Sequence, residues 1–245
     1  MSWERAKVKG KTHIAPMKRI RLAWELKLFA AGYGRIAGVD EVGRGAWAGP
    51  LVAAAVLMEP FEISACRPLT RWVRDSKALS VKQREQTFGA LIHRLRWAIG
   101  VVTREELDTL GMTVSNGLVL ERAIAALAEP PDFVLVDGRG FRLAFPHQQV
   151  IHGDQKIFCV AAASIIAKVT RDRWMEHLDR EYPGYAFGRH KGYGTAAHQA
   201  ALARFGPCPI HRRSFAPISA AIGECRVGHQ AFRASQEVTA HLPAR

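Results

Sequence analysis

The chain has 245 residues, of which 48% are hydrophobic, and it carries a formal net charge of +13. The hydrophobic content excludes a wholly disordered chain, and the length suits one domain with its own core and short appendages. Its apolar runs are far shorter than the roughly 20 residues that span a bilayer, and the N-terminus lacks a signal-peptide pattern, so we expect a cytoplasmic protein that does not enter the membrane.

The excess of positive charge is the strongest compositional feature. A pI near 10.1 predicts long-range attraction to polyanions, nucleic acid above all, with a merely basic soluble protein as the alternative. The cysteines Cys66, Cys159, Cys208 and Cys225 form no CxxC pair, which argues against a disulfide framework or a zinc ribbon. Carboxylates in such a basic chain indicate a metal site if they face nucleic acid, because a cation must then lie between the carboxylate and the phosphate.

The N-terminal segment is basic and has no periodic pattern. Apolar spacing then predicts a helix over about 18–31, which Gly32 and Gly34 end. Met17 stands where a shorter protein could start, and we expect the residues before it to be dispensable.

The next stretch places two acids at the end of a short buried strand. Residues 36–39 predict the strand, Asp40 and Glu41 follow it, and the turn Gly43-Arg44-Gly45 leads to a second buried strand over 51–58. Side chains alternate between the faces of a strand, so only one of the two carboxylates should face a cleft unless the strand twists or bulges. Bare glycine amides beside an arginine suit contact with a phosphate or a sugar near a metal, whereas an exposed acidic hairpin turn is the alternative.

Helix and turn signals continue through the middle of the chain. Ser80 is placed to cap a helix over about 81–95, and the turn before it presents Asp75-Ser76-Lys77. A lysine on such a loop is usually just solvated. The further elements expected here are a strand over 97–102, a short helix opened by a capping box at 103–106 and ended by Gly111, and a helix over 113–128.

The pattern of a short apolar strand followed by an acid occurs twice more. Residues 133–136 lead to Asp137 and Gly138, and residues 149–153 lead to Asp154. The longest helix is predicted from there, over 155–181, with small residues in its first turns that allow close packing on a sheet. Asp154 has an alternative role as the N-cap of this helix, which is common for aspartate.

A glycine-rich basic loop follows over 187–195, and Tyr193 lies at its centre. A tyrosine between glycines and cations suits stacking on a sugar or base, and a core tyrosine in a tight loop is the alternative. Thr195 then caps a helix that ends at Gly206, and residues 211–213 are again basic.

The acids after the three strands point to divalent cations. Clustered carboxylates raise one another's pKa unless a counter-charge is present, and oxygen ligands without paired His or Cys favour Mg²⁺ or Mn²⁺. Two ions about 3.5–4 Å apart activate a water and stabilise the leaving oxygen in phosphodiester hydrolysis. The glycine turn lacks both the GK[ST] ending of a P-loop and the glycine spacing of a dinucleotide fingerprint.

Several separated motifs resemble those of the bacterial ribonuclease HII family, the type 2 ribonucleases H. The resemblance covers about residues 25–217 and is carried by Asp40-Glu41-Val42-Gly43-Arg44-Gly45, Asp75-Ser76-Lys77, Val136-Asp137-Gly138, Gly153-Asp154, residues 162–172, and His190-Lys191-Gly192-Tyr193-Gly194-Thr195. It implies an α/β protein with a ribonuclease H-like fold, in which helices flank a mixed sheet and a helical extension lies at the C-terminal end.

The resemblance also implies an activity and its cofactor. Members cleave the RNA strand of RNA:DNA hybrids and single ribonucleotides embedded in duplex DNA, leaving 5′-phosphate and 3′-hydroxyl ends. The implied cofactor is Mn²⁺ or Mg²⁺, and the residues that match the catalytic and metal-binding acids are Asp40, Glu41, Asp137 and Asp154.

Substrate contacts carry over from the same motifs. The turn Gly43-Arg44-Gly45 matches the family's contact with the ribonucleotide 2′-hydroxyl, the group that distinguishes RNA from DNA. Tyr193 matches the residue that packs on the following deoxyribose, and Lys77 is a candidate phosphate contact. Ala78 stands where the family often has a second lysine. Further candidates for phosphate or structural contacts are Lys168, Arg171 and Arg213.

On this basis we expect a basic extension and helix over 1–34, a catalytic domain over 35–223 and a loose tail over 224–245. We also expect a monomer. The alternatives are a catalytically silent protein that binds hybrids, which a missing acid would favour, and another two-metal nuclease on the same fold.

Overall fold

A mixed sheet of five strands lies at the centre of the part of the chain that the computed structural model describes, residues 20–73, 76, 79–140 and 142–223. The strand order is β3-β2-β1-β4-β5, with antiparallel pairing from β3 to β1 and parallel pairing from β1 to β5. The strands are β1 Ile36–Val42, β2 Leu51–Met58, β3 Arg96–Val102, β4 Phe133–Asp137 and β5 His147–Val150.

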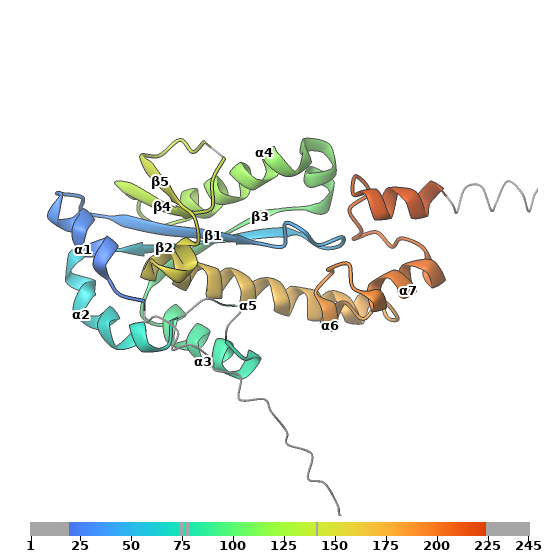
Figure 1. The fold of residues 1–245 in the computed structure, drawn as a ribbon, viewed down its shortest axis with the longest axis horizontal. Coiled ribbons are helices and arrows are strands. Elements are labelled where there is room, and N and C mark those ends of the chain that lie inside the picture. The colour runs from blue at the N-terminus through green and yellow to red at the C-terminus, as the bar shows by residue number, and fades with distance from the viewer. Residues whose placement is uncertain (1–19, 74–75, 77–78, 141, 224–245) are drawn as a thin grey trace, which may run out of the picture.

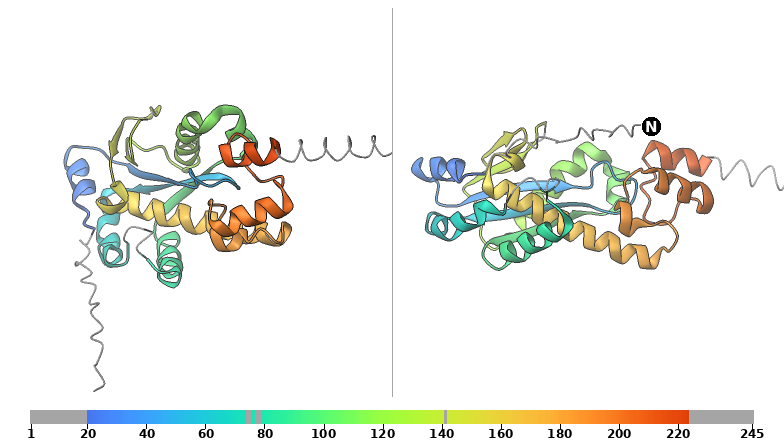
Figure 2. Two further views of the ribbon diagram at one scale, coloured as in Figure 1. Left: turned by 45° about the vertical axis from the view of Figure 1, so that its right-hand side comes forward. Right: turned by 60° about the horizontal axis from the view of Figure 1, so that its bottom comes forward.

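Helices cover both faces of this sheet (Figure 1). On one face α5 packs against β1 and β2, and α1, α2 and α3 contribute to the same apolar cluster; the views in Figure 2 show α3 beside α5. On the other face α4 packs against β3 and β2. The helices are α1 Ala23–Ala30, α2 Ile63–Cys66, α3 Val81–Ile92, α4 Arg104–Ala125, α5 Phe158–Glu181, α6 Phe187–His190 and α7 Ala196–Phe205, and residues 216–223 are also helical.

The hydrophobic pattern of the sequence follows from these two covered faces. All eight side chains of β2 are buried, as its continuous apolar run predicts. In β1 the side chains alternate between the clusters, so Ile36 lies on the α5 face and Ala37 and Val39 lie on the α4 face. The expected α/β fold with a mixed sheet flanked by helices is therefore confirmed.

Close packing of α5 on β1 depends on one glycine. A Cβ atom at Gly38 would lie 2.3 Å from the carbonyl carbon of Cys159 and 2.4 Å from the amide nitrogen of Val160. Only a residue without a side chain lets the strand and the helix backbone approach this closely. The fully buried Ala161, Ala162 and Ala163 continue the same contact.

The first turn of α5 receives its cap from a distant segment. Ile157 is the N-cap residue and makes no side-chain cap, whereas Glu25 of α1 accepts the N–H of Cys159 at 2.9 Å through Oε1. The expectation that this helix starts near residue 155 was wrong, because residues 153–155 form a 3₁₀ turn. The alternative role of Asp154 as the N-cap was therefore wrong as well.

Other local signals were confirmed with small shifts. Ser80 and Thr103 make the capping boxes of α3 and α4. Gly111, which was expected to end a short helix, has φ of 74° and ψ of 165°, so the helical geometry is interrupted there and the two expected helices meet at a kink within α4. Residues 1–19 and 224–245, with the expectations for the termini, lie outside the described residues. No helix within the described part is long and apolar enough to cross a membrane.

The segments that follow α6 and α7 contact the turn between β1 and β2. Ala46 pairs with Tyr193 and Ala48 pairs with His211 in isolated antiparallel bridges, and Trp47 N–H donates to the Gly192 carbonyl at 2.8 Å. The segments after α5 thereby extend the region around the end of β1.

A pair of glycine substitutions tests the strand–helix contact. Gly38→Ala should lower the free energy of unfolding by about 1–3 kcal/mol, because its methyl group overlaps the α5 backbone. Gly89→Ala is the control, since a Cβ there meets nothing within 4 Å and alanine favours a helix by about 0.5–1 kcal/mol. Urea unfolding of both variants measures the difference; two variants of equal stability would contradict the packing argument.

Candidate active site

A cavity of about 490 Å³ opens beside the C-terminal ends of β1 and β4. It brings together all four acids that the sequence singles out, the glycine turn, and Tyr193. Its lining residues are Asp40, Glu41, Val42, Gly43, Arg44, Gly45, Ser76, Asp137, Asp154, Ser164, Lys168 and Tyr193.

Parallel pairing explains why the acids meet. The register of β1 against β4 runs to Val39 and Val136, so Asp40 and Asp137 follow at the same level on neighbouring strands. The turn after β5 adds Asp154, and it is held in place because Asp137 Oδ1 accepts the Gly153 N–H at 2.6 Å. Three strand ends thus converge at one edge, as the sequence predicts.

Asp40 and Glu41 both line the cavity although they point to opposite faces of β1. No bulge is needed, since β1 keeps regular pairing with β2 through Val42. The pairing with β4 stops one residue before Asp40. This edge of β1 is therefore open, and side chains from both faces border the same cavity.

Burial and the neighbouring acids disfavour the ionised form of Asp40. Only 6% of its surface is exposed, and burial, followed by the adjacent Glu41, raises the pKa of Asp40 well above its usual value. Its Oδ1 accepts the Glu41 N–H at 2.8 Å. The hydroxyl group of Ser164, on α5, opposes this shift of the Asp40 pKa.

Glu41 retains an unsatisfied oxygen. Arg44 Nη1 donates to Oε1 at 3.4 Å, while Oε2 is buried and has no hydrogen-bond partner among the described residues. Burial raises the pKa of Glu41 even though Arg44 opposes the shift. A buried carboxylate oxygen with no donor is suited to bind a cation.

The residues present fit a hard divalent cation, because the described lining of the cavity offers four carboxylates and contains no His or Cys. Within the described ranges, no group of three or more His, Cys, Asp or Glu side chains is already arranged as a ligand shell. Arg44 binds Glu41, and the backbone N–H groups of Glu41 and Gly153 bind Asp40 and Asp137.

The glycine turn rests on a buried arginine. Gly43 has φ of 97°, and a Cβ there would lie 2.4 Å from Arg171 Nε. A Cβ at Gly45 would meet nothing within 4 Å, and the Arg44 side chain is exposed. The turn thus presents open backbone to the cavity.

Arg171 and Arg212 bind backbone carbonyl groups. Both are fully buried, so of the two roles expected for Arg171, a phosphate contact or a structural contact, the geometry supports the structural one. Arg171 donates to the carbonyls of Pro50, Lys191 and Ala48 at 2.9, 2.9 and 3.1 Å, and Arg212 donates to those of Gly49 and Arg44 at 3.0 and 3.1 Å.

The remaining basic candidates differ in position. Lys168 lines the cavity and binds Asp172 at 2.7 Å, and its Nζ lies 6.0 Å from the centre of the Tyr193 ring. Arg213 is exposed and is not among the residues that line the cavity. Lys77 lies outside the described residues.

Sequence reasoning gave no role to two hydroxyl groups that lie beside the acids. Ser76 and Ser164 are buried with their Oγ atoms 3.2 Å apart, and Arg84 Nε donates to the Ser76 carbonyl at 2.9 Å. No periodic or spacing signal marks these serines, because their contact joins segments 88 residues apart.

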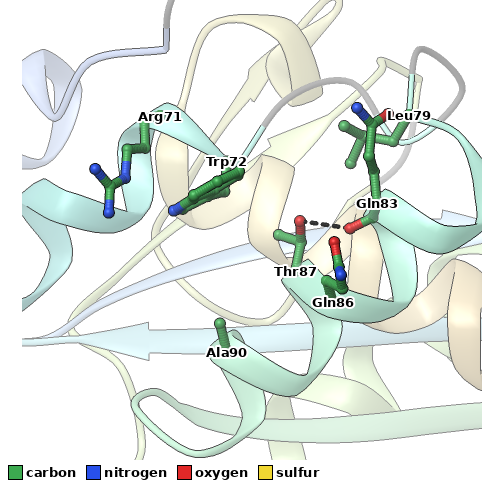
Figure 3. Close-up of a pocket in the computed structure, with 7 residues that line it drawn as sticks. All are labelled: Arg71, Trp72, Leu79, Gln83, Gln86, Thr87 and Ala90. Carbon is green, nitrogen blue, oxygen red and sulfur yellow. Dashed lines mark hydrogen bonds between the residues drawn. The ribbon is translucent and has the colours of Figure 1, made fainter.

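A second cavity, of about 520 Å³, lies between the segment before residue 73 and α3 (Figure 3). Its described lining contains no acid, so it offers no carboxylate ligand for a divalent cation. The lining residues are Arg71, Trp72, Leu79, Gln83, Gln86, Thr87 and Ala90.

Comparison with known proteins gives consistent relatives. A family model described as Ribonuclease HII matches residues 37–218. Ribonuclease HII of Geobacillus thermodenitrificans is 47% identical over 204 residues, 82% of this chain and 76% of the relative. That of Maricaulis maris is 48% identical over 191 residues, 77% of this chain and 84% of the relative. The crystal structure of ribonuclease H2 from Pyrococcus horikoshii is similar with a TM-score of 0.67 and 30% identity, over 78% of this chain and 99% of that chain.

Replacing Asp40 with a neutral residue tests whether its buried charge destabilises the metal-free protein. A carboxyl group whose folded pKa is raised contributes stability below its unfolded pKa and loses it as the pH rises through the folded pKa. Asp40→Asn should therefore increase the unfolding free energy of the metal-free protein by about 1–3 kcal/mol at pH 8, and not at pH 3.

Urea unfolding in EDTA at the two pH values measures this difference. The control is Glu181→Gln, which removes an exposed acid at the end of α5 and should leave stability unchanged. An equal gain for Asp40→Asn at both pH values would show that the charge of Asp40 is not the cause.

Proposed function

The chain belongs to the ribonuclease HII family of metal-dependent endoribonucleases that act on RNA:DNA hybrids, and we propose that it also cleaves at single ribonucleotides embedded in duplex DNA. The products proposed are 5′-phosphate and 3′-hydroxyl ends. The observation that carries this proposal is the convergence of Asp40, Glu41, Asp137 and Asp154 in one cavity beside an open glycine turn.

We assign the four acids to cation binding and catalysis. Their oxygens, including the unpartnered Oε2 of Glu41, would hold Mn²⁺ or Mg²⁺. Two such ions, when bound, supply an activated water and charge stabilisation at the leaving oxygen. The Glu41 N–H orients Asp40, and the Gly153 N–H orients Asp137. These contacts limit how far each carboxylate turns when substrate arrives.

The turn Gly43-Arg44-Gly45 is proposed to contact the ribonucleotide. Open space at Gly45 lets the backbone approach the 2′-hydroxyl, which a bulkier residue would obstruct. The exposed Arg44 provides a cation for a neighbouring phosphate while it also holds Glu41. The proposed ribonucleotide contact and two of the four acids thus lie together in residues 40–45, at the end of β1 and in its turn.

Tyr193 is proposed to pack on the deoxyribose that follows the ribonucleotide. It is half-buried, lines the cavity, and has Arg171 Cζ 5.6 Å from its ring centre. Cations behind the ring favour a nearby phosphate backbone. Lys77 is proposed as a further phosphate contact. We also propose that residues 35–223 of a single copy contain the whole catalytic unit.

Cleavage of a labelled DNA duplex with one ribonucleotide tests the function directly. The wild-type protein should cut on the 5′ side of the ribonucleotide with Mn²⁺ or Mg²⁺ and not with EDTA. Asp40→Asn should lose at least about a hundredfold in kcat while still binding the duplex, since it removes one acid of the cluster.

The control Glu181→Gln removes an acid outside the cavity and should cleave like the wild type. Binding without cutting under both metals would replace the proposal with a silent hybrid-binding protein. Cutting that ignores the ribonucleotide would indicate another two-metal nuclease.

Tyr193 variants test whether the protein reads the ribonucleotide junction. Tyr193→Ala should lower kcat/KM about tenfold more on a duplex with one ribonucleotide than on an all-RNA strand in a hybrid, because the latter offers no following deoxyribose. Tyr193→Phe keeps the ring and should retain the preference. Equal losses on both substrates would count against junction reading.

A further inference from the structure

Three buried histidines lie beneath the loop that carries Tyr193, and none of them lines the catalytic cavity. His190 is 8% exposed, and His198 and His211 are fully buried. The rings of His190 and His198 stack with centres 4.4 Å apart and planes at 14°. This histidine cluster has no part in the proposed chemistry, yet it contacts the backbone of the loop directly.

Hydrogen bonds run in one direction through His211 and His198. The Cys208 N–H donates to His211 Nδ1 at 2.9 Å, so this nitrogen is an acceptor and the proton lies on Nε2. His211 Nε2 is 3.0 Å from His198 Nε2 and donates to it. His198 therefore carries its proton on Nδ1, which donates to the Tyr193 carbonyl at 3.0 Å.

The opposite tautomers of His211 and His198 would break the series of hydrogen bonds at both of its ends. A proton on His211 Nδ1 would face the N–H of Cys208, and an unprotonated His198 Nδ1 would face the carbonyl oxygen of Tyr193. The Cys208 carbonyl, 3.3 Å from His211 Nδ1, already accepts the His211 N–H at 3.1 Å. One arrangement of protons thus satisfies every group.

The surroundings keep both rings neutral. Aromatic rings of Trp47, Tyr185 and Phe187 lie against His198 or His211. Burial is the main cause that lowers the pKa of His198 and lowers that of His211 to about 4. The directed chain is consequently intact at neutral pH.

We propose that His198 and His211 are positioning residues for substrate choice: together they aim the Tyr193 loop by a directed hydrogen-bond chain from the Cys208 amide to the Tyr193 carbonyl. His198 holds the carbonyl, and His211 selects the tautomer of His198 that is able to do so. Thr195 N–H also donates to this carbonyl at 2.8 Å, so loss of the chain loosens the loop without releasing it. The inference rests on the proposed role of Tyr193 at the junction.

Amide substitutions separate this role from packing, because the two positions need opposite replacements. The Asn amide overlays histidine Nδ1 and the Gln amide overlays Nε2. At position 198, His198→Asn keeps the donor to the Tyr193 carbonyl and His198→Gln does not. At position 211, His211→Gln keeps the donor to His198 and His211→Asn does not.

The measured quantity is the ratio of kcat/KM on the single-ribonucleotide duplex to kcat/KM on the hybrid. His198→Gln and His211→Asn should lower it about fivefold, the worth of one hydrogen bond, and His198→Asn and His211→Gln should stay within about twofold of the wild type. His177→Gln and His177→Asn, at an exposed histidine of α5, are matched controls and should leave the ratio unchanged. If Gln is tolerated better than Asn at both positions, side-chain volume is the cause and the proposal fails.

A nitrogen NMR measurement of the histidine tautomers tests the chain without any activity. His198 should be protonated at Nδ1 and His211 at Nε2 in the wild-type protein, and His211→Asn should add the Nε2-protonated form of His198. His198 protonated at Nε2 in the wild type would overturn the proposal. If Tyr193→Ala leaves the cleavage ratio unchanged, junction reading itself fails; if only the histidine variants leave it unchanged, the positioning role fails alone.

Discussion

Repulsion among four carboxylates that line one cavity is the constraint on which this site depends. The parallel pairing of β1 with β4 ends at Val39 and Val136, so Asp40 and Asp137 emerge together and have no strand between them. The fold resists their separation because Gly38 seats β1 directly on α5. The acids are thereby kept close at an energetic cost that divalent cations are suited to offset.

Positive charge is arranged around this cavity in an unusual way. Arg171 and Arg212 are fully buried, and their described partners are backbone carbonyls of the β1–β2 turn and the Tyr193 loop instead of acids. Burial, and then the neighbouring Arg171, lower the pKa of Arg212 to about 9. Because carbonyls carry no net charge, the two cations leave a positive field beneath the surface that we propose to bind nucleic acid.

Much of the fold and of the site was predictable from local signals. Short apolar strands followed by Asp40, Asp137 and Asp154 identified three strand ends that meet, and Ser80 and Thr103 marked two helix starts through their capping boxes. The neighbouring sequence could not decide whether Asp154 is a metal ligand or a helix cap, because an aspartate before a helix is consistent with both roles. The carboxylate of Glu25, 134 residues away in the sequence, accepts the N–H of Cys159 and caps the helix. No local sequence pattern near Cys159 predicts this contact.

The sequence by itself determined which groups are present: oxygen ligands after three strands, a side-chain-free turn, and a basic chain that attracts polyanions. Tertiary structure decided how they act. It opened the edge of β1 so that Asp40 and Glu41 share one cavity despite facing opposite sides, buried Arg171 beneath the turn, and joined His198 and His211 under Tyr193. The physical reason is that strand periodicity and capping depend on neighbouring residues, whereas burial and directed hydrogen bonds between distant segments exist only after the chain has packed.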